Sequence, residues 1–103
     1  MKLYELIIIQ ERLQLEDDSD YVQEREYIDT ITSKVYKTEV DRDTAYENFI
    51  HPYIEEKKTN TNIRTYQAEN CFKITVLKKW VPNQESDILG TIYRVFKKET
   101  ELE

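Results

Sequence analysis

The side chains that most often carry catalysis are scarce in this sequence. His51 is the one histidine and Cys71 the one cysteine. A catalytic imidazole or thiol works with a base, an acid or an orienting group, and neither residue has a recognisable partner in the sequence. We therefore interpret His51 as a helix residue before Pro52, and Cys71 as a small apolar residue at the start of a strand.

Motifs for metals and cofactors are missing as well. The chain has one glycine, so it contains neither a GxGxxG turn nor a phosphate-binding P-loop. It also lacks the cysteines and histidines of a zinc site. Asp17, Asp18 and Asp20 offer oxygen ligands, but the spacing and central glycine of an EF-hand are absent, and a solvated loop is the simpler interpretation. The sequence predicts a protein that is not an enzyme and holds no metal or cofactor.

The negative charge of the chain lies in its first third. Residues 1–30 carry a net charge of −6, which equals the net charge of the whole chain. Such a cluster attracts basic surfaces and repels nucleic acid and anionic membranes. Tyr21 and Tyr27 lie within it, and tyrosines are common interface anchors. The predicted partner-binding residues are Glu16, Asp17, Asp18, Asp20, Tyr21, Glu24, Glu26, Tyr27 and Asp29. A solvated loop without a partner is the alternative.

A second candidate surface lies toward the C-terminus, where basic residues alternate with aromatic ones. Its members are Lys73, Lys78, Lys79, Trp80, Arg94 and Lys97. Basic and aromatic side chains on a sheet can bind single-stranded nucleic acid through phosphate contacts and base stacking. The acidic net charge opposes this activity and the RNP motif is absent, so we rank it second.

Two strands and a helix are expected before the basic region. Apolar residues of one parity predict a strand over residues 3–15, although a helix remains possible for residues 10–15. Acidic residues then predict a loop over residues 16–20. Residues 26–40 alternate β-branched or aromatic residues with polar ones, which predicts a half-buried strand.

The helix is expected to start near Asp41, because Thr44 and Glu47 have the spacing of a capping box. Its apolar stripe comprises Tyr46, Phe49, Ile50, Tyr53 and Ile54. Pro52 lies inside this pattern and lacks an amide hydrogen, so we expect a kink or break near His51.

The remaining segments, 62–68, 71–80 and 88–97, predict three strands of an antiparallel meander. Gly90 is expected to mark a bulge or a close approach, and residues 99–103 a frayed tail. The predicted fold is one α+β domain, residues 1–103, with the order β-β-α-β-β-β. Its kinked amphipathic helix packs on one face of a mixed or antiparallel sheet.

No secretion signal is recognisable, and no apolar run approaches the roughly 20 residues of a membrane helix, so we expect a cytoplasmic protein. Residues with AT-rich codons are abundant, which indicates a low-GC bacterium, a phage or another mobile element. The leading hypothesis is a non-enzymatic inhibitor whose acidic surface binds a basic, nucleic-acid-handling host protein; anti-CRISPR proteins and DNA-mimic nuclease inhibitors have this physical profile. The alternatives are single-stranded nucleic-acid binding, or a self-assembling structural protein in which acidic and basic surfaces of two subunits meet.

Overall fold

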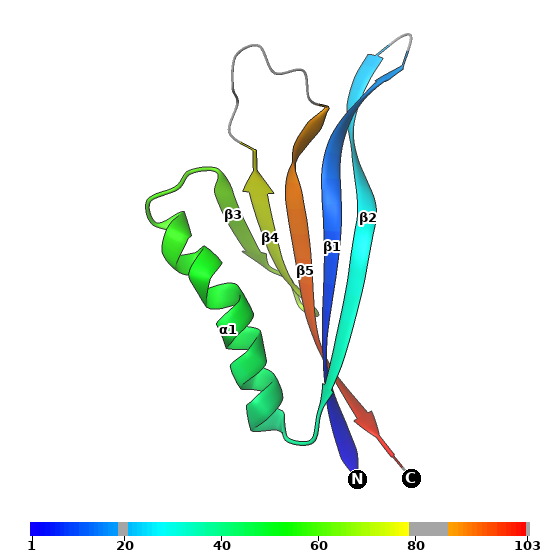
Figure 1. Ribbon diagram of the computed structural model, residues 1–103, viewed down its shortest axis with the longest axis vertical. Coiled ribbons are helices and arrows are strands. Elements are labelled where there is room, and N and C mark those ends of the chain that lie inside the picture. Colours follow the sequence, from blue (N-terminus) through cyan, green and yellow to red (C-terminus); the bar gives the residue numbers. More distant parts are fainter. Residues whose placement is uncertain (19–20, 79–86, 103) are drawn as a thin grey trace.

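The computed structural model describes residues 1–18, 21–78 and 87–102, and it is an antiparallel sheet with a helix on one side (Figure 1). In chain order the elements are β1 (Lys2–Asp18), β2 (Tyr21–Tyr36), α1 (Glu39–Lys57), β3 (Ile63–Gln67), β4 (Phe72–Leu77) and β5 (Ile88–Glu101). Within the sheet the strand order is β2-β1-β5-β4-β3. The α+β class is confirmed, and the sheet is antiparallel rather than mixed.

The strand order in the sheet differs from the order along the chain because β5 inserts between β1 and β4. The last strand of the chain is therefore the central strand, and β2 and β3 are the two edges. Residues 99–101, expected as part of a frayed tail, continue β5 and pair with the start of β1.

β1 is a strand along its whole length, including residues 10–15, where a helix had remained possible. It pairs with β2 on one side and with β5 on the other. These two ladders fix the extended conformation that the residue types alone leave open. Residues 16–18, expected in a loop, form the end of this strand, while Ser19 and Asp20 lie outside the described residues.

β2 is more exposed than its pattern predicts. It covers residues 21–36 rather than 26–40, and its large apolar residues are more than half exposed: Val22 55%, Ile28 61%, Ile31 62% and Val35 53%. Alternation shows which side chains share a face of a strand, but it does not show whether another element covers that face. β2 is an edge strand, and these four residues point away from α1.

α1 begins at Glu39, earlier than the sequence predicts. Its N-cap is Thr38, whose side-chain oxygen accepts a hydrogen bond of 3.2 Å from the amide of Asp41. The expected kink near His51 is not seen, since α1 is one helix that contains Pro52. Asn48, whose carbonyl would otherwise bond to residue 52, is exposed like Pro52, so water can satisfy that carbonyl.

The core lies between α1 and the sheet. The apolar stripe of the helix is confirmed: Tyr46 and Ile50 are buried, and the other three members pack against the same cluster. The sheet contributes the buried residues Leu6, Ile63, Phe72, Ile74 and Val95. In the described part of the chain, the opposite face of the sheet has no helix against it.

A bulge and a close approach, the two alternatives expected at Gly90, are both present. The register between β1 and β5 shifts next to the pair of Leu13 and Gly90, which is a β-bulge. A Cβ atom on Gly90 would lie 2.4 Å from the carbonyl oxygen of Val76. Because that oxygen belongs to the neighbouring strand, it cannot move aside without disturbing the β4–β5 ladder.

Gly90→Ala should therefore lower the free energy of unfolding by roughly 2 kcal/mol, the usual cost of forcing an extra methyl group into a packed site. Urea denaturation followed by far-UV circular dichroism measures this loss. Glu99→Ala, at an exposed position of the same strand, is the matched control. Equal stability of the two variants would contradict the close approach.

Candidate binding groove on the helix-free face

The two faces of the sheet can be assigned from the strand register. Residues directly opposite each other in an antiparallel pair lie on the same face. Val95 of β5 is aligned with Ile8 of β1 and Phe72 of β4 on the face that α1 covers. Arg94, the preceding residue of β5, is aligned with Lys73 and points the other way. We call this second side the helix-free face.

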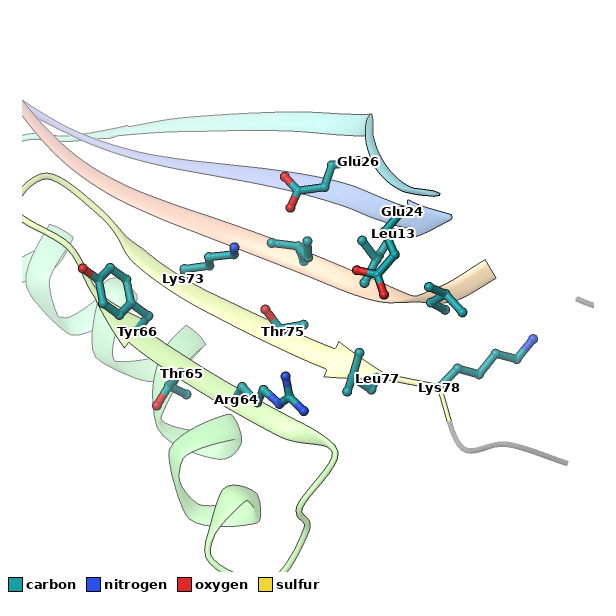
Figure 2. A pocket seen from close by; sticks show the side chains of 12 residues that line it. Leu13, Glu24, Glu26, Arg64, Thr65, Tyr66, Lys73, Thr75, Leu77 and Lys78 are labelled. Atoms are coloured by element: carbon teal, nitrogen blue, oxygen red, sulfur yellow. The ribbon is translucent and has the colours of Figure 1, made fainter. Parts of the chain in front are cut away.

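A groove of about 610 Å³ lies on the helix-free face (Figure 2). Residues of β2 and β3 line its two sides, and β1, β5 and β4 lie between them. Figure 2 shows Glu24 and Glu26 along one wall, Arg64 and Tyr66 along the other, and Lys73 and Thr75 of β4 between them. Leu13, Leu77 and Ile92 add an apolar lining. The groove thus has an acidic side, a basic side and an apolar floor.

Strand alternation explains why charges gather here. In β3, Arg64 and Tyr66 alternate with Ile63, which is buried against α1. In β4, Lys73 alternates with the completely buried Ile74. Each strand directs its apolar residue toward the core and its polar neighbour into the groove.

An ion network beside the groove ties three strands together. The guanidinium of Arg94 donates one hydrogen bond of 2.9 Å to Glu11 of β1 and another of 2.9 Å to Glu26 of β2. Glu11 is 7% exposed, and its other carboxylate oxygen has no partner among the described residues. Burial alone would lower the pKa of Arg94, but the hydrogen bonds and charges of Glu11 and Glu26 outweigh it and raise that pKa. Arg94 therefore stays charged.

Three charged groups of the groove remain available to a ligand. Glu24, Arg64 and Lys73 line it, and within the described parts of the chain none of them forms an ion pair. A ligand can therefore pair with them without first breaking a contact of the free protein.

The structure divides the predicted acidic surface between the two faces of the sheet formed by β1 and β2. Glu24 and Glu26 lie in the groove, whereas Glu16 accepts a hydrogen bond from the hydroxyl of Tyr27 and lies 3.4 Å from Arg25. The hydrogen bond to Glu16 is the main cause that raises the pKa of Tyr27. Asp29 lies 3.8 Å from Arg12. The other members are Asp17, Asp18 and Tyr21, at strand ends, and Asp20, outside the described residues.

The predicted basic surface is divided too. Lys73 and Lys78 line the groove and Arg94 lies beside it. Lys97 lies on the helix side, 4.6 Å from the ring centroid of Tyr46 and 3.8 Å from Asp43. Lys79 and Trp80 are outside the described residues.

Sequence reasoning missed Glu11, Arg64 and Tyr66. Their positions in alternating strands show that they point away from their apolar neighbours. Only the strand order, with β5 between β1 and β4, shows that they share one surface with the acidic end of β2.

The residues first considered for catalysis lie away from the groove. His51 is exposed on α1, 3.6 Å from Glu55, and Cys71 is a half-buried free thiol. In the described segments no three potential metal ligands come together. A helix of the length and apolarity needed to cross a membrane is likewise not found in those segments.

Comparisons with protein-family models, curated proteins and solved structures give no match to this chain. The geometry and charges of the groove are therefore the basis for the proposed function.

The ion network predicts a large effect from one substitution. Arg94→Met leaves the buried Glu11 without its cation, and because the Arg94 side chain is 28% exposed we expect the free energy of unfolding at pH 7 to fall by about 2 kcal/mol, the cost of leaving a buried hydrogen-bonding group unsatisfied. Adding Glu11→Met removes both charges, so the double variant should lose less than Arg94→Met alone. Urea denaturation of both variants tests this. A double variant that loses as much stability as Arg94→Met alone, or more, would show that the buried charge of Glu11 does not depend on Arg94.

Proposed function

We propose that this protein is a non-enzymatic binding protein that docks a basic segment of another protein in the groove of its helix-free face. One observation carries the proposal: the groove places the carboxylate of Glu24 opposite the cations Arg64 and Lys73, and none of the three forms an ion pair with another described residue. Exposed sheet faces and grooves with mixed polar and apolar linings are typical of sites that bind other molecules.

A polypeptide fits this charge pattern better than a nucleic acid does. A lysine or arginine of the partner would pair with Glu24, while a carboxylate or main-chain carbonyl would meet Arg64 or Lys73. Apolar side chains of the same segment would contact Leu13 and Leu77. Phosphates could reach Arg64 and Lys73, but they would meet Glu24 and Glu26 across the same groove.

The charge of the whole chain supports a basic partner. The net charge of −6 originates in residues 1–30, which include β1 and the part of β2 from residue 21 to residue 30. This charge would raise the encounter rate with a cationic protein. Among such partners we propose a nucleic-acid-handling host protein, whose phosphate-binding surface would be blocked on binding. The chain would then act as an inhibitor encoded by a phage or mobile element, in the manner of an anti-CRISPR or DNA-mimic protein.

A second candidate function, binding of single-stranded nucleic acid, has its own supporting observation. Tyr66 is 65% exposed on β3, between Arg64 on its own strand and Lys73 opposite it on β4. An exposed aromatic ring beside cations can stack on a base while the cations contact phosphates.

Glu24→Lys distinguishes the two functions. Fluorescence anisotropy at ~0.15 M salt would follow two probes, a peptide rich in lysine and arginine and an oligothymidylate. If the groove binds a basic segment, Glu24→Lys should weaken peptide binding about fivefold, as expected for reversal of one interfacial charge.

Glu47→Lys on the exposed side of α1 is the matched control, because it changes the net charge equally. It should alter peptide affinity by less than about twofold, the effect of a distant screened charge. Equal weakening by both substitutions would contradict a specific site. Tighter oligothymidylate binding by Glu24→Lys, together with its loss in Lys73→Glu, would favour the nucleic-acid function.

A further inference from the structure

One edge of the sheet is long, regular and exposed. The residues of β2 from Thr30 to Tyr36 pair without interruption with β1, from Gln10 back to Tyr4. At one end of this segment the register shifts, with Asp29 as the extra residue, and at the other end β2 stops. All seven residues except Tyr36 are exposed. The outer side of this segment presents main-chain donors and acceptors that no described strand uses.

The opposite edge of the sheet is short. β3 has five residues, and on the side that α1 covers, Lys57 donates a hydrogen bond of 2.7 Å to the side-chain oxygen of Thr65. The edge segment of β2 is longer, no described element packs over it, and it contains no proline to interrupt pairing.

We propose that the edge segment Thr30–Tyr36 pairs antiparallel with the same segment of a second copy of this chain. Two identical segments that overlap completely are related by a two-fold axis at their midpoint, which is Ser33. The bulge at Asp29 and the end of the strand at Tyr36 limit the regular segment, so this register follows from the structure.

The side chains complement each other in this register. Ile31 comes to lie opposite Val35 of the second copy, and both are more than half exposed in the single chain, at 62% and 53%. Two such pairs form on the helix-free face, and cross-strand pairs of β-branched residues stabilise antiparallel sheets.

The charges just outside the segment also match. Asp29 and Lys37 border the segment at its two ends, so antiparallel overlap brings Asp29 of one copy near Lys37 of the second copy, again twice by symmetry. The groove lies beyond the bulge, outside the paired segment, so this inference does not rest on the proposed function.

Two charge-reversal variants test the register. In Asp29→Lys each cross-strand charge pair becomes positive against positive, and in Lys37→Asp negative against negative. We expect each variant alone to dimerise about tenfold more weakly than the wild type in analytical ultracentrifugation, since two repulsive pairs replace two attractive ones.

Mixing the two variants in equal amounts should restore dimerisation, because every introduced charge then faces an opposite charge in the mixed dimer. This step also controls for the ion pair between Asp29 and Arg12, which Asp29→Lys breaks in any case. Glu47→Lys, which alters charge away from the edge, should dimerise like the wild type. A monomeric wild type at millimolar concentration, or variants that dimerise normally, would overturn the proposal; so would a mixture that stays monomeric.

Discussion

In the described part of the chain a single helix packs on a five-stranded sheet, and it can cover only one face of that sheet. At about 1.5 Å per residue, the 19 residues of α1 span about 28 Å, whereas the molecule is 54 Å long. Figure 1 shows α1 beside one part of the sheet, with the β1–β2 hairpin extending beyond it. The strands direct one set of apolar residues toward α1, while their other side carries the charged residues of the groove and exposed apolar residues such as Ile28 and Ile31 of β2. The division of the molecule into a packed side and a helix-free face follows from this constraint.

The helix-free face nevertheless has a fixed structure. Ile92 lies on it, between Glu11 and Thr75 of the neighbouring strands, and is only 2% exposed. Arg94 holds Glu11 and Glu26 in place, so three strands share one network of charges. Groups fixed in advance lose little freedom when a ligand binds, which favours binding over a face of mobile side chains. The groove and the edge of β2 are separate surfaces, and one chain can use both at the same time.

Much of the fold follows from local sequence, because period-2 alternation specifies the strands and the 3.6-residue stripe specifies the helix. Gly90 was also identified correctly, since a single glycine within a strand pattern usually accommodates a neighbour. The residues of the groove could be predicted only in part from the sequence. Glu24 and Glu26 are predicted from their charge. That Glu16 lies on the opposite face of the sheet from them could not be predicted, because the acidic residues 16–18 indicate a loop although they are the end of β1. Arg64 and Tyr66 line the same groove as Glu24 and Glu26 only because β5 lies at the centre of the sheet. This long-range pairing of strands cannot be predicted from a local sequence pattern.

The helix-free face is proposed as the binding face. Titration of the ¹⁵N-labelled protein with a peptide rich in lysine and arginine, followed by two-dimensional NMR, tests it residue by residue. We expect the backbone signals of Leu13, Glu24 and Ile92 to shift in a saturable way, while those of Val40 and Glu47 on the outer side of α1 stay in place. Saturable shifts confined to α1, or no change around the groove at any peptide concentration, would contradict it.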